Sequence, residues 1–414
     1  MSILLVTNGH GEDRLAVCLA EALGRVWPWA ELEAVPLVGE GRTLSEAGLA
    51  VPGPRVTVPS GGLVRPELPV VWRDLRSGLI RQFRRQMDFV RRRARAAERV
   101  IAVGDTFAGW VAGRAAAGRP MVLVATAKSS YIHGHSRLEC SWMRRRCQHV
   151  FARDEKTAAD LCRAGVPASW EGNLMMDALE PPGEPLAAPG DEPVVALLPG
   201  SRSDAYVNLR ALAAVLARLG DLLGPVLGLV PLAAGLDRDR AARVLTESGF
   251  RPGSRSLSES ACDPALAPAA GDHNRPPVSG HVRELVLGSA RIRVVEGRFG
   301  DVIRSADIVV GLAGTANEQA AGLGKPVVAF VGPGVQFGPR FLRAQKRLLG
   351  EALAVAPAEP DGAAAEVAAI LTDPGRRARM AAAGRKRMGP PGAAARIARA
   401  IARLWRGEAE ARCP

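Results

Sequence analysis

Cysteine, lysine and long apolar runs are all scarce in this sequence. Its six cysteines form no Cys-x-x-Cys pair and no His-x-x-x-His accompanies them, so neither a zinc cage nor a disulfide framework is indicated. The longest uncharged apolar stretch, residues 222–236, contains Pro225 and Pro231 and is shorter than the roughly 20 residues that a membrane-spanning helix needs. Residues 3–6 are too few for the apolar region of a signal peptide. We therefore expect a cytoplasmic protein with no membrane span.

Lysine accounts for only five of the 55 basic residues, and the others are arginine. The formal net charge of +13 is therefore an arginine excess, which is typical of a genome-wide codon preference. Because such an excess raises the pI without building a site, it does not predict a nucleic-acid partner. With 414 residues and a hydrophobic content of 47%, the chain is too apolar for disorder and long enough for two domains.

Short β-branched runs alternate with longer stretches of helical periodicity along the chain. This alternation is typical of parallel βαβ units and predicts an α/β fold. Strands are expected at residues 3–7, 100–104, 121–126, 194–198, 226–230, 292–295, 308–310 and 327–331.

The segment 181–193 is rich in proline and glycine and cannot hold a helix or a central strand. We interpret it as a linker between an N-terminal domain, residues 1–180, and a C-terminal domain, residues 194–388. Each half opens with a strand and a glycine turn, which predicts two doubly wound parallel-sheet domains facing a central cleft. Residues 251–277 show little periodicity and are expected to form a mobile insertion, and residues 389–414 are expected to form a C-terminal helix.

The first expected strand is followed by Asn8, Gly9, His10, Gly11 and Glu12, and then by leucines at helical spacing. Glycines at a strand-to-helix turn let the backbone approach a ligand, and the start of the helix offers free N–H groups. The dinucleotide fingerprint Gly-x-Gly-x-x-Gly is incomplete here. A ligand-binding loop and a simple tight turn therefore remain alternative interpretations.

The second half opens with a strand and then Gly200, Ser201 and Arg202, before another helix. The helix dipole and a guanidinium group both favour oxyanions, so this turn predicts a site for a diphosphate. The alternative is that Ser203 or Asp204 caps the helix while Arg202 is solvated.

Gly314, Thr315, Glu318 and Gln319 follow the strand expected at 308–310. A carboxylate at this helix start could accept hydrogen bonds from the ribose hydroxyls of a nucleotide, which is our functional interpretation of Glu318. The alternative is a capping box in which Thr315 and Glu318 bond to the backbone of the first turn.

Gln336 lies in a further glycine loop, residues 332–337, which follows the last expected strand. The carboxyl ends of parallel strands meet at one edge of a sheet, so this loop is expected beside Arg202 and Glu318. Several glycine loops along one edge indicate a nucleotide site more strongly than any one of them does.

No metal site is predicted. Asp237-x-Asp239 matches the Asp-x-Asp of metal-dependent sugar transferases, but it begins a helix, where acids are expected in any case. His133-x-His135 has no third ligand at metal spacing, so a polar loop is the better interpretation.

Residues 72–99 contain ten arginines and three carboxylates, with Trp72, Phe83, Met87 and Val90 among the apolar residues at helical spacing. A basic amphipathic helix with an aromatic residue on its apolar face can lie on an anionic membrane. The alternative is a helix that packs on its own domain and exposes a solvated arginine face.

Several motifs together resemble lipid-A-disaccharide synthase, and most closely the branch called lipid-A-disaccharide synthase-related proteins. Synthases proper begin with a Gly-Glu-x-Ser-Gly-Asp turn, whereas this chain has Gly9-His10-Gly11-Glu12-Asp13. The resemblance covers nearly the whole chain except 251–277. The motifs that carry it are Leu197-Leu198-Pro199-Gly200-Ser201-Arg202, Gly172-Asn173-Leu174-Met175-Met176-Asp177, Gly314-Thr315-Ala316-Asn317-Glu318-Gln319, the Asn8 to Asp13 turn and Gly334-Val335-Gln336-Phe337.

This resemblance implies a GT-B fold, a UDP-sugar donor held by the C-terminal domain, and inverting transfer without a metal or other cofactor. Arg202 and the turn around Ser201 would hold the donor phosphates, and Glu318 would hold the ribose. Asp105 would lie at the acceptor side, and either Asp105 or His10 would be the catalytic base. The family reaction moves a 2,3-diacylglucosamine from UDP onto 2,3-diacylglucosamine 1-phosphate, so the implied acceptor is a lipid-linked sugar.

Alternatives to this function and to the role of Asp105 stay open. A nonhydrolytic UDP-sugar 2-epimerase uses the same fold, and a binding protein could keep the nucleotide loops without a working base. Asp105 could also serve only as the cap of the helix expected at 106–117.

A lipid-linked acceptor would place the protein peripherally on the inner face of the cytoplasmic membrane.

Overall fold

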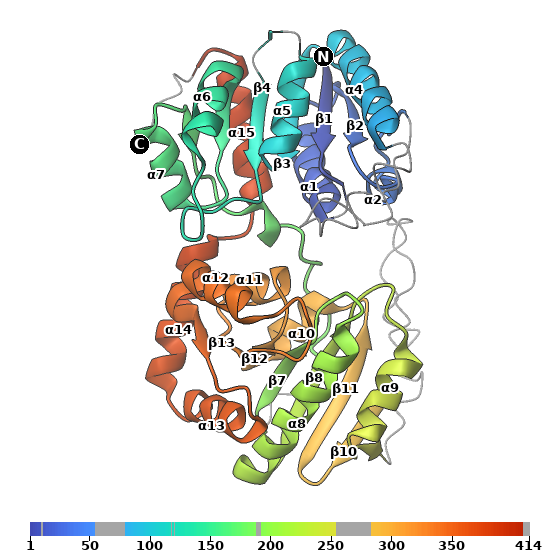
Figure 1. Cartoon of the computed structure of the whole chain (residues 1–414), viewed down its shortest axis with the longest axis vertical. Coiled ribbons are helices and arrows are strands. Elements are labelled where there is room, and N and C mark those ends of the chain that lie inside the picture. The colour runs from blue at the N-terminus through green and yellow to red at the C-terminus, as the bar shows by residue number, and fades with distance from the viewer. Residues whose placement is uncertain are drawn as a thin grey trace, which may run out of the picture. The chain divides into compact units, whose positions relative to one another are not determined.

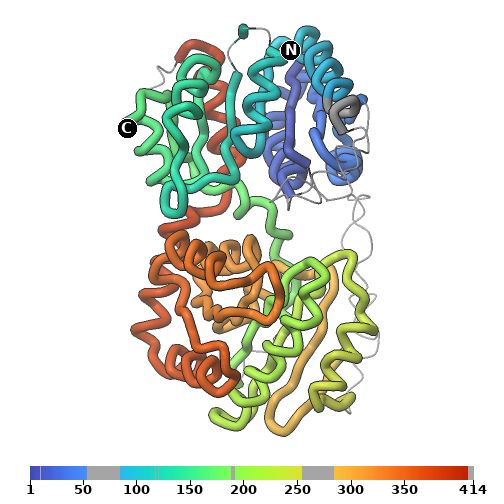
Figure 2. Tube along the Cα trace, in the orientation of Figure 1, coloured from blue at the N-terminus to red at the C-terminus, as the bar shows by residue number. Residues whose placement is uncertain are grey.

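The computed structural model describes residues 1–9, 11–53, 79–116, 118–119, 121–187, 192–253 and 283–408 (Figure 1, Figure 2). The chain divides into two compact units. The first unit contains Met1–Ala178 and Gly389–Pro414, and the second contains Leu179–Met388. Most of the insertion expected at 251–277 lies outside the described residues.

A six-stranded parallel sheet forms the centre of the first unit. Its order is β2-β1-β3-β4-β5-β6, so β2 and β3 lie on opposite sides of β1. β4 and the central residues 3–6 of β1 are entirely apolar, as expected of strands that are covered on both faces. The strands are β1 (Ser2–Thr7), β2 (Glu31–Pro36), β3 (Arg99–Gly104), β4 (Met121–Ala125), β5 (Cys147–Phe151) and β6 (Ala168–Ser169).

Helices cover both faces of this sheet (Figure 1). On one face, a buried core that includes Met87, Val111 and Leu161 joins α4, α5, α6 and α7 to the strands. On the other face, Leu19 and Ile397 belong to a second core that joins α1 and α15 to the strands. The helical elements are α1 (Gly11–Val26), α2 (Arg42–Glu46), α4 (Leu79–Ala96), α5 (Thr106–Ala115), α6 (Arg137–Arg146), α7 (Glu155–Arg163), η1 (Leu174–Met176) and α15 (Ala393–Trp405).

α4 contains the described part of the basic segment 72–99, of which residues 72–78 lie outside the described residues. Met87, Val90 and Ala94 are buried in the core beneath α4, so its apolar face packs on its own sheet. This packing is the alternative that the amphipathic pattern left open, and it leaves the arginine face exposed. No helix within the described ranges is long and apolar enough to cross a membrane.

The C-terminal helix α15 is held in the first unit by the motif that ends at Asp177. The Asp177 carboxylate accepts hydrogen bonds from the backbone N–H groups of Gly392 and Ala394, the latter at 2.5 Å, and so caps the start of α15. Arg396 on α15 donates to the carbonyl oxygen of Glu171 at 2.7 Å. Chain segments more than two hundred residues apart are thereby joined.

An eight-stranded sheet of order β14-β13-β12-β7-β8-β11-β10-β9 forms the centre of the second unit. The strands from β14 to β11 pair in parallel. An unpredicted antiparallel hairpin of β10 and β11 follows from a tight turn at Gly288, whose φ of 55° suits glycine. The strands are β7 (Val194–Leu198), β8 (Val226–Leu232), β9 (Arg251–Pro252), β10 (Arg283–Leu287), β11 (Ala290–Glu296), β12 (Ile308–Gly311), β13 (Val327–Ala329) and β14 (Leu353–Val355).

Glu180 and the start of the predicted linker are bound to a helix of the second unit. Gly183 donates its N–H to Asp301 at 2.8 Å, and Glu180 accepts a hydrogen bond from the N–H of Gly300 at 2.9 Å. Both partners lie on α10, so this segment belongs to the second unit. The helical elements of that unit are α8 (Ala205–Leu223), α9 (Arg238–Glu247), α10 (Phe299–Ser305), α11 (Thr315–Gly322), α12 (Pro339–Leu349), η3 (Gly350–Ala352), α13 (Pro360–Leu371) and α14 (Pro374–Met388).

The cysteines differ from the expectation at one position. Cys162 is disulfide-bonded, whereas Cys18, Cys140 and Cys147 are free. The cysteine spacing indicated no disulfide framework and did not predict this bond, because spacing along the chain does not report which cysteines meet in space. Burial raises the pKa of the Cys147 thiol to about 12, which keeps that thiol protonated.

Candidate functional site

In each sheet, the first strand of the unit lies between two later strands, so the chain continues to both sides of it. In the second unit, β7 has β8 on one side and β12 on the other, with Leu198 paired to Gly311. In open α/β sheets, ligands bind beside the carboxyl ends of the strands at such a point. The loops that leave β7 and β12 there carry most of the predicted nucleotide-binding residues.

The loop after β7 contains Gly200, Ser201 and Arg202. Gly200 has a φ of +101°, in the left-handed region that favours glycine, and Arg202 is exposed. Asp204 is the N-cap residue of α8, but its side chain makes no capping hydrogen bond to that helix. Its carboxylate instead accepts the backbone N–H of Gln336 at 3.1 Å. The alternative that Asp204 caps α8 through its side chain is therefore wrong.

The loop of residues 332–338, after β13, lies against this turn. Arg202 Nη1 donates to Gln336 Oε1 at 3.2 Å, and the N–H of Gly334 donates to Asn208 Oδ1 on α8, also at 3.2 Å. A Cβ on Gly334 would come within 2.8 Å of Asp204, so only glycine allows this close approach. The structure thus places Gln336 beside Arg202.

α11 begins after β12 without a side-chain cap. Its N-cap residue is Gly314, and Thr315 is already its first helical residue. The capping box between Thr315 and Glu318 is therefore not formed, and that interpretation of Glu318 is wrong. Glu318 lies 8% exposed in the first turn of α11, where the helix dipole favours a negative charge, and Gln319 is half-buried beside it. The assignment of Glu318 to a ribose stays a prediction.

Two buried amide side chains that sequence reasoning missed hold the loop between β12 and α11. Asn317 Nδ2 donates to the carbonyl oxygen of Gly311 at 3.0 Å and to Gln345 Oε1 at 2.9 Å. Gln345 Nε2 donates to the carbonyl oxygens of Ala313 and Gly314, both at 3.0 Å. The one signal in the sequence is that Gln345 falls on the apolar face of α12, where a solvated glutamine is not expected.

In the first unit, the corresponding point lies between β1 and β3, and Asn8 and Asp105 follow these strands. Asn8 Nδ2 donates to Asp105 Oδ1 at 2.9 Å, and the backbone N–H of Asp105 donates to Asn8 Oδ1 at 2.8 Å. Gly104 has a φ of +147°, and a Cβ there would overlap Asn8 Oδ1. A glycine at position 104 is therefore required for this pair to form.

Asp105 is also the N-cap residue of α5. Its Oδ1 accepts the backbone N–H groups of Phe107 at 2.9 Å and Ala108 at 3.0 Å, so the interpretation of Asp105 as a helix cap is confirmed. These bonds and the bond from Asn8 all end on Oδ1. Because a proton could be taken up by Oδ2, capping does not conflict with a role as a base, which stays a prediction.

In the turn after β1, the backbone of Gly9 packs closely against the backbone of Val38. Gly9 has a φ of +103°, and the carbonyl oxygen of Val38 occupies the place where a Cβ would lie. Glu12 donates its N–H to the carbonyl oxygen of Gly9 at 3.2 Å, and Gly11 is the first residue of α1. His10, the second candidate base, lies outside the described residues.

An ion pair that the sequence did not predict lies after β4, the neighbour of β3. Lys128 Nζ donates to both carboxylate oxygens of Glu139, at 2.6 and 2.8 Å, and Ser136 completes a capping box with Glu139 at the start of α6. Burial opposes ionisation of Glu139, but the hydrogen bonds from Lys128 and Ser136 outweigh it and lower its pKa to about 2. His135 is buried nearby, and burial lowers its pKa.

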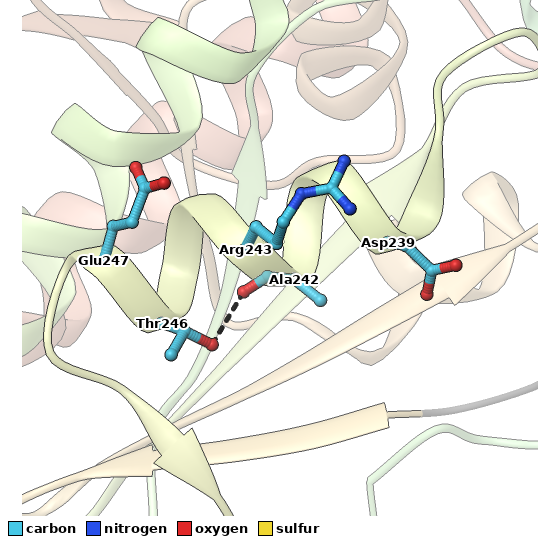
Figure 3. Close-up of a pocket in the computed structure, with 5 residues that line it drawn as sticks. All are labelled: Asp239, Ala242, Arg243, Thr246 and Glu247. Carbon is cyan, nitrogen blue, oxygen red and sulfur yellow. Dashed lines mark hydrogen bonds between the residues drawn. The ribbon is translucent and has the colours of Figure 1, made fainter.

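The Asp-x-Asp segment has the structural role that its position predicted. Asp237 caps α9 by accepting the N–H of Arg240 at 2.6 Å. A hollow of about 300 Å³ beside this helix is lined by none of the predicted site residues (Figure 3). Within the described ranges, no group of His, Cys, Asp and Glu side chains is arranged to hold a metal ion. The hollow is lined by Asp239, Ala242, Arg243, Thr246 and Glu247.

Comparison with solved structures defines the class of fold. A putative UDP-N-acetylglucosamine 2-epimerase from Listeria monocytogenes matches with a TM-score of 0.59 and 14% identity, over 99% of this chain and 98% of that one. MurG from Acinetobacter baumannii matches with a TM-score of 0.57 and 14% identity, over 97% of this chain and 99% of that one. The chain therefore has the GT-B fold, with one parallel-sheet α/β domain in each unit.

Comparison of sequences finds a match to part of the chain. No family model matches the chain. A lipid-A-disaccharide synthase from Thiobacillus denitrificans is 29% identical over 270 residues, which covers 58% of this chain and 59% of that protein. The match thus spans about three fifths of the length of this curated relative. These comparisons establish the GT-B fold.

Proposed function

We propose that this protein is an inverting, metal-independent glycosyltransferase. It would move an acylated glucosamine-type sugar from a UDP donor to a lipid-linked sugar acceptor, with no other cofactor. The observation that carries the proposal is the similarity to a lipid-A-disaccharide synthase in a chain of GT-B fold. A second support is the meeting of three glycine loops at one edge of the second sheet, because this is where open α/β sheets bind ligands.

The donor would bind at the carboxyl ends of β7 and β12. Arg202 is exposed there and has one hydrogen bond to the neutral amide of Gln336, which a diphosphate oxygen could replace. Glu318 would accept the ribose hydroxyls from the first turn of α11. The remaining donor contacts are assigned to Gly200, Ser201, Gly314, Thr315 and Gln319.

The acceptor would bind to the loop formed by Asn8, Gly9, Gly11 and Glu12, with Asp105 or His10 as the base. The base takes the proton of the acceptor hydroxyl while that oxygen bonds to the anomeric carbon. The bond from this carbon to the β-phosphate oxygen breaks, and its electron pair leaves with UDP. Attack from the opposite face inverts the configuration, and Arg202 with the adjacent helix starts stabilises the departing charge.

The second candidate is a UDP-sugar 2-epimerase of the same fold. It is favoured by the likeness to the Listeria monocytogenes protein, and a Staphylococcus aureus MnaA structure with bound UDP is similar as well, with a TM-score of 0.57 and 14% identity over 98% of this chain and 97% of that one. Such an enzyme needs no acceptor lipid. A binding protein without a working base is the third possibility.

Contact with the inner face of a cytoplasmic membrane belongs to the proposal, because a lipid-linked acceptor resides in a bilayer. The arginine face of α4, the described part of 72–99, would supply electrostatic attraction to anionic lipid.

Product analysis tests the proposal. The full chain would be incubated with UDP-diacylglucosamine, with and without diacylglucosamine 1-phosphate, and the products followed by mass spectrometry and proton NMR. A transferase forms a disaccharide and free UDP only when both substrates are present. Inversion of the C2 configuration of a UDP-sugar without acceptor would establish the epimerase instead. UDP binding without either product would establish the binding protein.

A further inference from the structure

α5 presents two large aromatic side chains to solvent. Phe107 is 37% exposed and Trp110 is 38% exposed, and their rings are stacked with centroids 6.5 Å apart. The guanidinium of Arg114, one helical turn further on, lies 5.6 Å from the centre of the Trp110 ring. The exposed ring surface would gain free energy if it were removed from water.

The exposure follows from how α5 packs. Its inner face carries Gly109 and Gly113, and Trp142 of α6 lies against both, at 3.1 and 3.0 Å from where their Cβ atoms would be. The small residues therefore face the domain and the large residues face outward. On α6, Leu138 is 83% exposed as well.

The same outer surface is strongly basic. α4, α5 and α6 pack through one core on one face of the sheet, so their outer sides form one layer (Figure 1). Among the described side chains of these three helices, Asp88 is the one exposed carboxylate, and Arg91 pairs with it at 3.2 Å. The exposed arginines are Arg84, Arg85, Arg92 and Arg95 on α4, Arg114 on α5, and Arg137, Arg144, Arg145 and Arg146 on α6.

We propose that the outer surface of α4, α5 and α6 docks on an anionic lipid bilayer, with Phe107 and Trp110 as its apolar anchor. The arginines supply long-range attraction, and the aromatic rings enter the headgroup region, where amphipathic rings are stable. Met87, Val90 and Ala94 of α4 are buried inside the domain, so these apolar side chains do not form the anchor. The anchor is on α5 instead.

The aromatic anchor lies close to the candidate base. Its use by the protein therefore rests on the proposed function. The N–H of Phe107 donates to Asp105 Oδ1, so the anchor starts two residues after the candidate base. A lipid-linked acceptor could thus present its sugar to Asp105 while its acyl chains remain in the bilayer. Membrane docking at this surface would shorten the path of the acceptor from bilayer to site.

Sedimentation with vesicles tests the surface without reference to turnover. The full chain and the double variant F107S/W110S would be spun with vesicles of equal parts phosphatidylglycerol and phosphatidylcholine, and with phosphatidylcholine alone. We expect wild type to bind the anionic vesicles, and the double variant to bind them at least about ten-fold more weakly. W29S removes a tryptophan that is 69% exposed outside this surface, and it should bind as wild type does.

Three outcomes would overturn the proposal: no binding of wild type to anionic vesicles, equal binding of wild type and F107S/W110S, or an equal loss in W29S. Circular dichroism would establish that each variant is folded. UDP affinity is measured separately by calorimetry, so failure of the docking surface and failure of the proposed function give different results. If both proposals hold, F107S/W110S loses transfer to acceptor in vesicles and keeps transfer to acceptor in detergent.

Discussion

Asn8 and Asp105 are joined by two reciprocal hydrogen bonds across the point where β1 and β3 separate. The side chain of Asn8 takes part in both bonds, whereas Asp105 accepts one through its carboxylate and donates the other from its backbone N–H. Asp105 also caps α5. The pair therefore fixes the candidate base relative to the glycine turn after β1. Residues 97 positions apart form this arrangement, and Gly104 is needed to make room for it.

Replacing Asp105 by Asn tests its role as the acceptor-side base. Asn also caps helices and keeps an oxygen for the N–H groups of α5, so D105N should fold normally. UDP affinity should not change, because the donor residues belong to the second unit. Turnover should fall by a factor of roughly 100 to 10,000, which is the usual contribution of a general base. Near-normal turnover in D105N, together with a collapse in H10A, would assign the role to His10.

Replacing Glu318 by Gln tests the ribose contact. Gln has nearly the size of Glu and keeps an acceptor oxygen, so the change should leave the thermal stability nearly unchanged. Loss of a charged acceptor should weaken UDP binding by about 1.5 to 3 kcal/mol in calorimetry. E359Q, an exposed acid of the same unit, is the matched control and should bind UDP as wild type does. Unchanged UDP affinity in E318Q would remove the ribose assignment.

The arginine face of α4 should contribute to vesicle binding through charge alone. A variant with R84Q, R85Q, R91Q and R92Q should bind anionic vesicles more weakly, at about 1 kcal/mol per cation near the surface. Added salt should weaken the binding of wild type and reduce this difference. R399Q/R403Q, which removes two exposed cations from α15, provides the comparison. Equal sedimentation of wild type and the α4 variant would contradict an electrostatic role for this helix.

Asp177 should stabilise the first unit without affecting ligand binding. D177A removes the carboxylate that caps α15, which should lower the free energy of unfolding by about 1 to 2 kcal/mol in urea titration. D177N keeps an acceptor oxygen and should lose less. UDP affinity should be unchanged in both, and a loss of UDP affinity equal to that of E318Q would show that the Gly172 to Asp177 motif acts on the nucleotide.

His149 should make the protein less stable in mild acid. Burial lowers the pKa of this imidazole from its usual 6.5 to about 4, and its Nε2 lies 2.9 Å from Ser169 Oγ. The unfolded chain takes up the proton as the pH falls below 6.5, whereas the folded chain does so only near 4. Stability present above pH 6.5 should therefore be lost towards pH 4, by about 2 to 3 kcal/mol. H149Q should show a flatter pH dependence of its melting temperature in this window.

Local sequence patterns were sufficient to predict the strands, the helices and the glycine turns of the site loops. Alternation of apolar runs and helical stretches is a short-range pattern, so β1, β7 and β12 and the helices after them could be predicted. The glycine turns could also be found, because a positive φ as at Gly9 and Gly200 strongly favours glycine.

Local patterns could not predict which of the competing interpretations holds or which distant residues meet, because both depend on packing. Thr315 and Glu318 had the spacing of a capping box, but α11 starts at Thr315 and the box cannot form. The amphipathic pattern of α4 was compatible with contact either to a membrane or to its own sheet. Burial of Val90 in the core shows that the helix packs on the sheet. The cap of α15 by Asp177 depends on chain segments far apart in sequence, and no local pattern encodes such a contact, because packing of the whole unit brings them together.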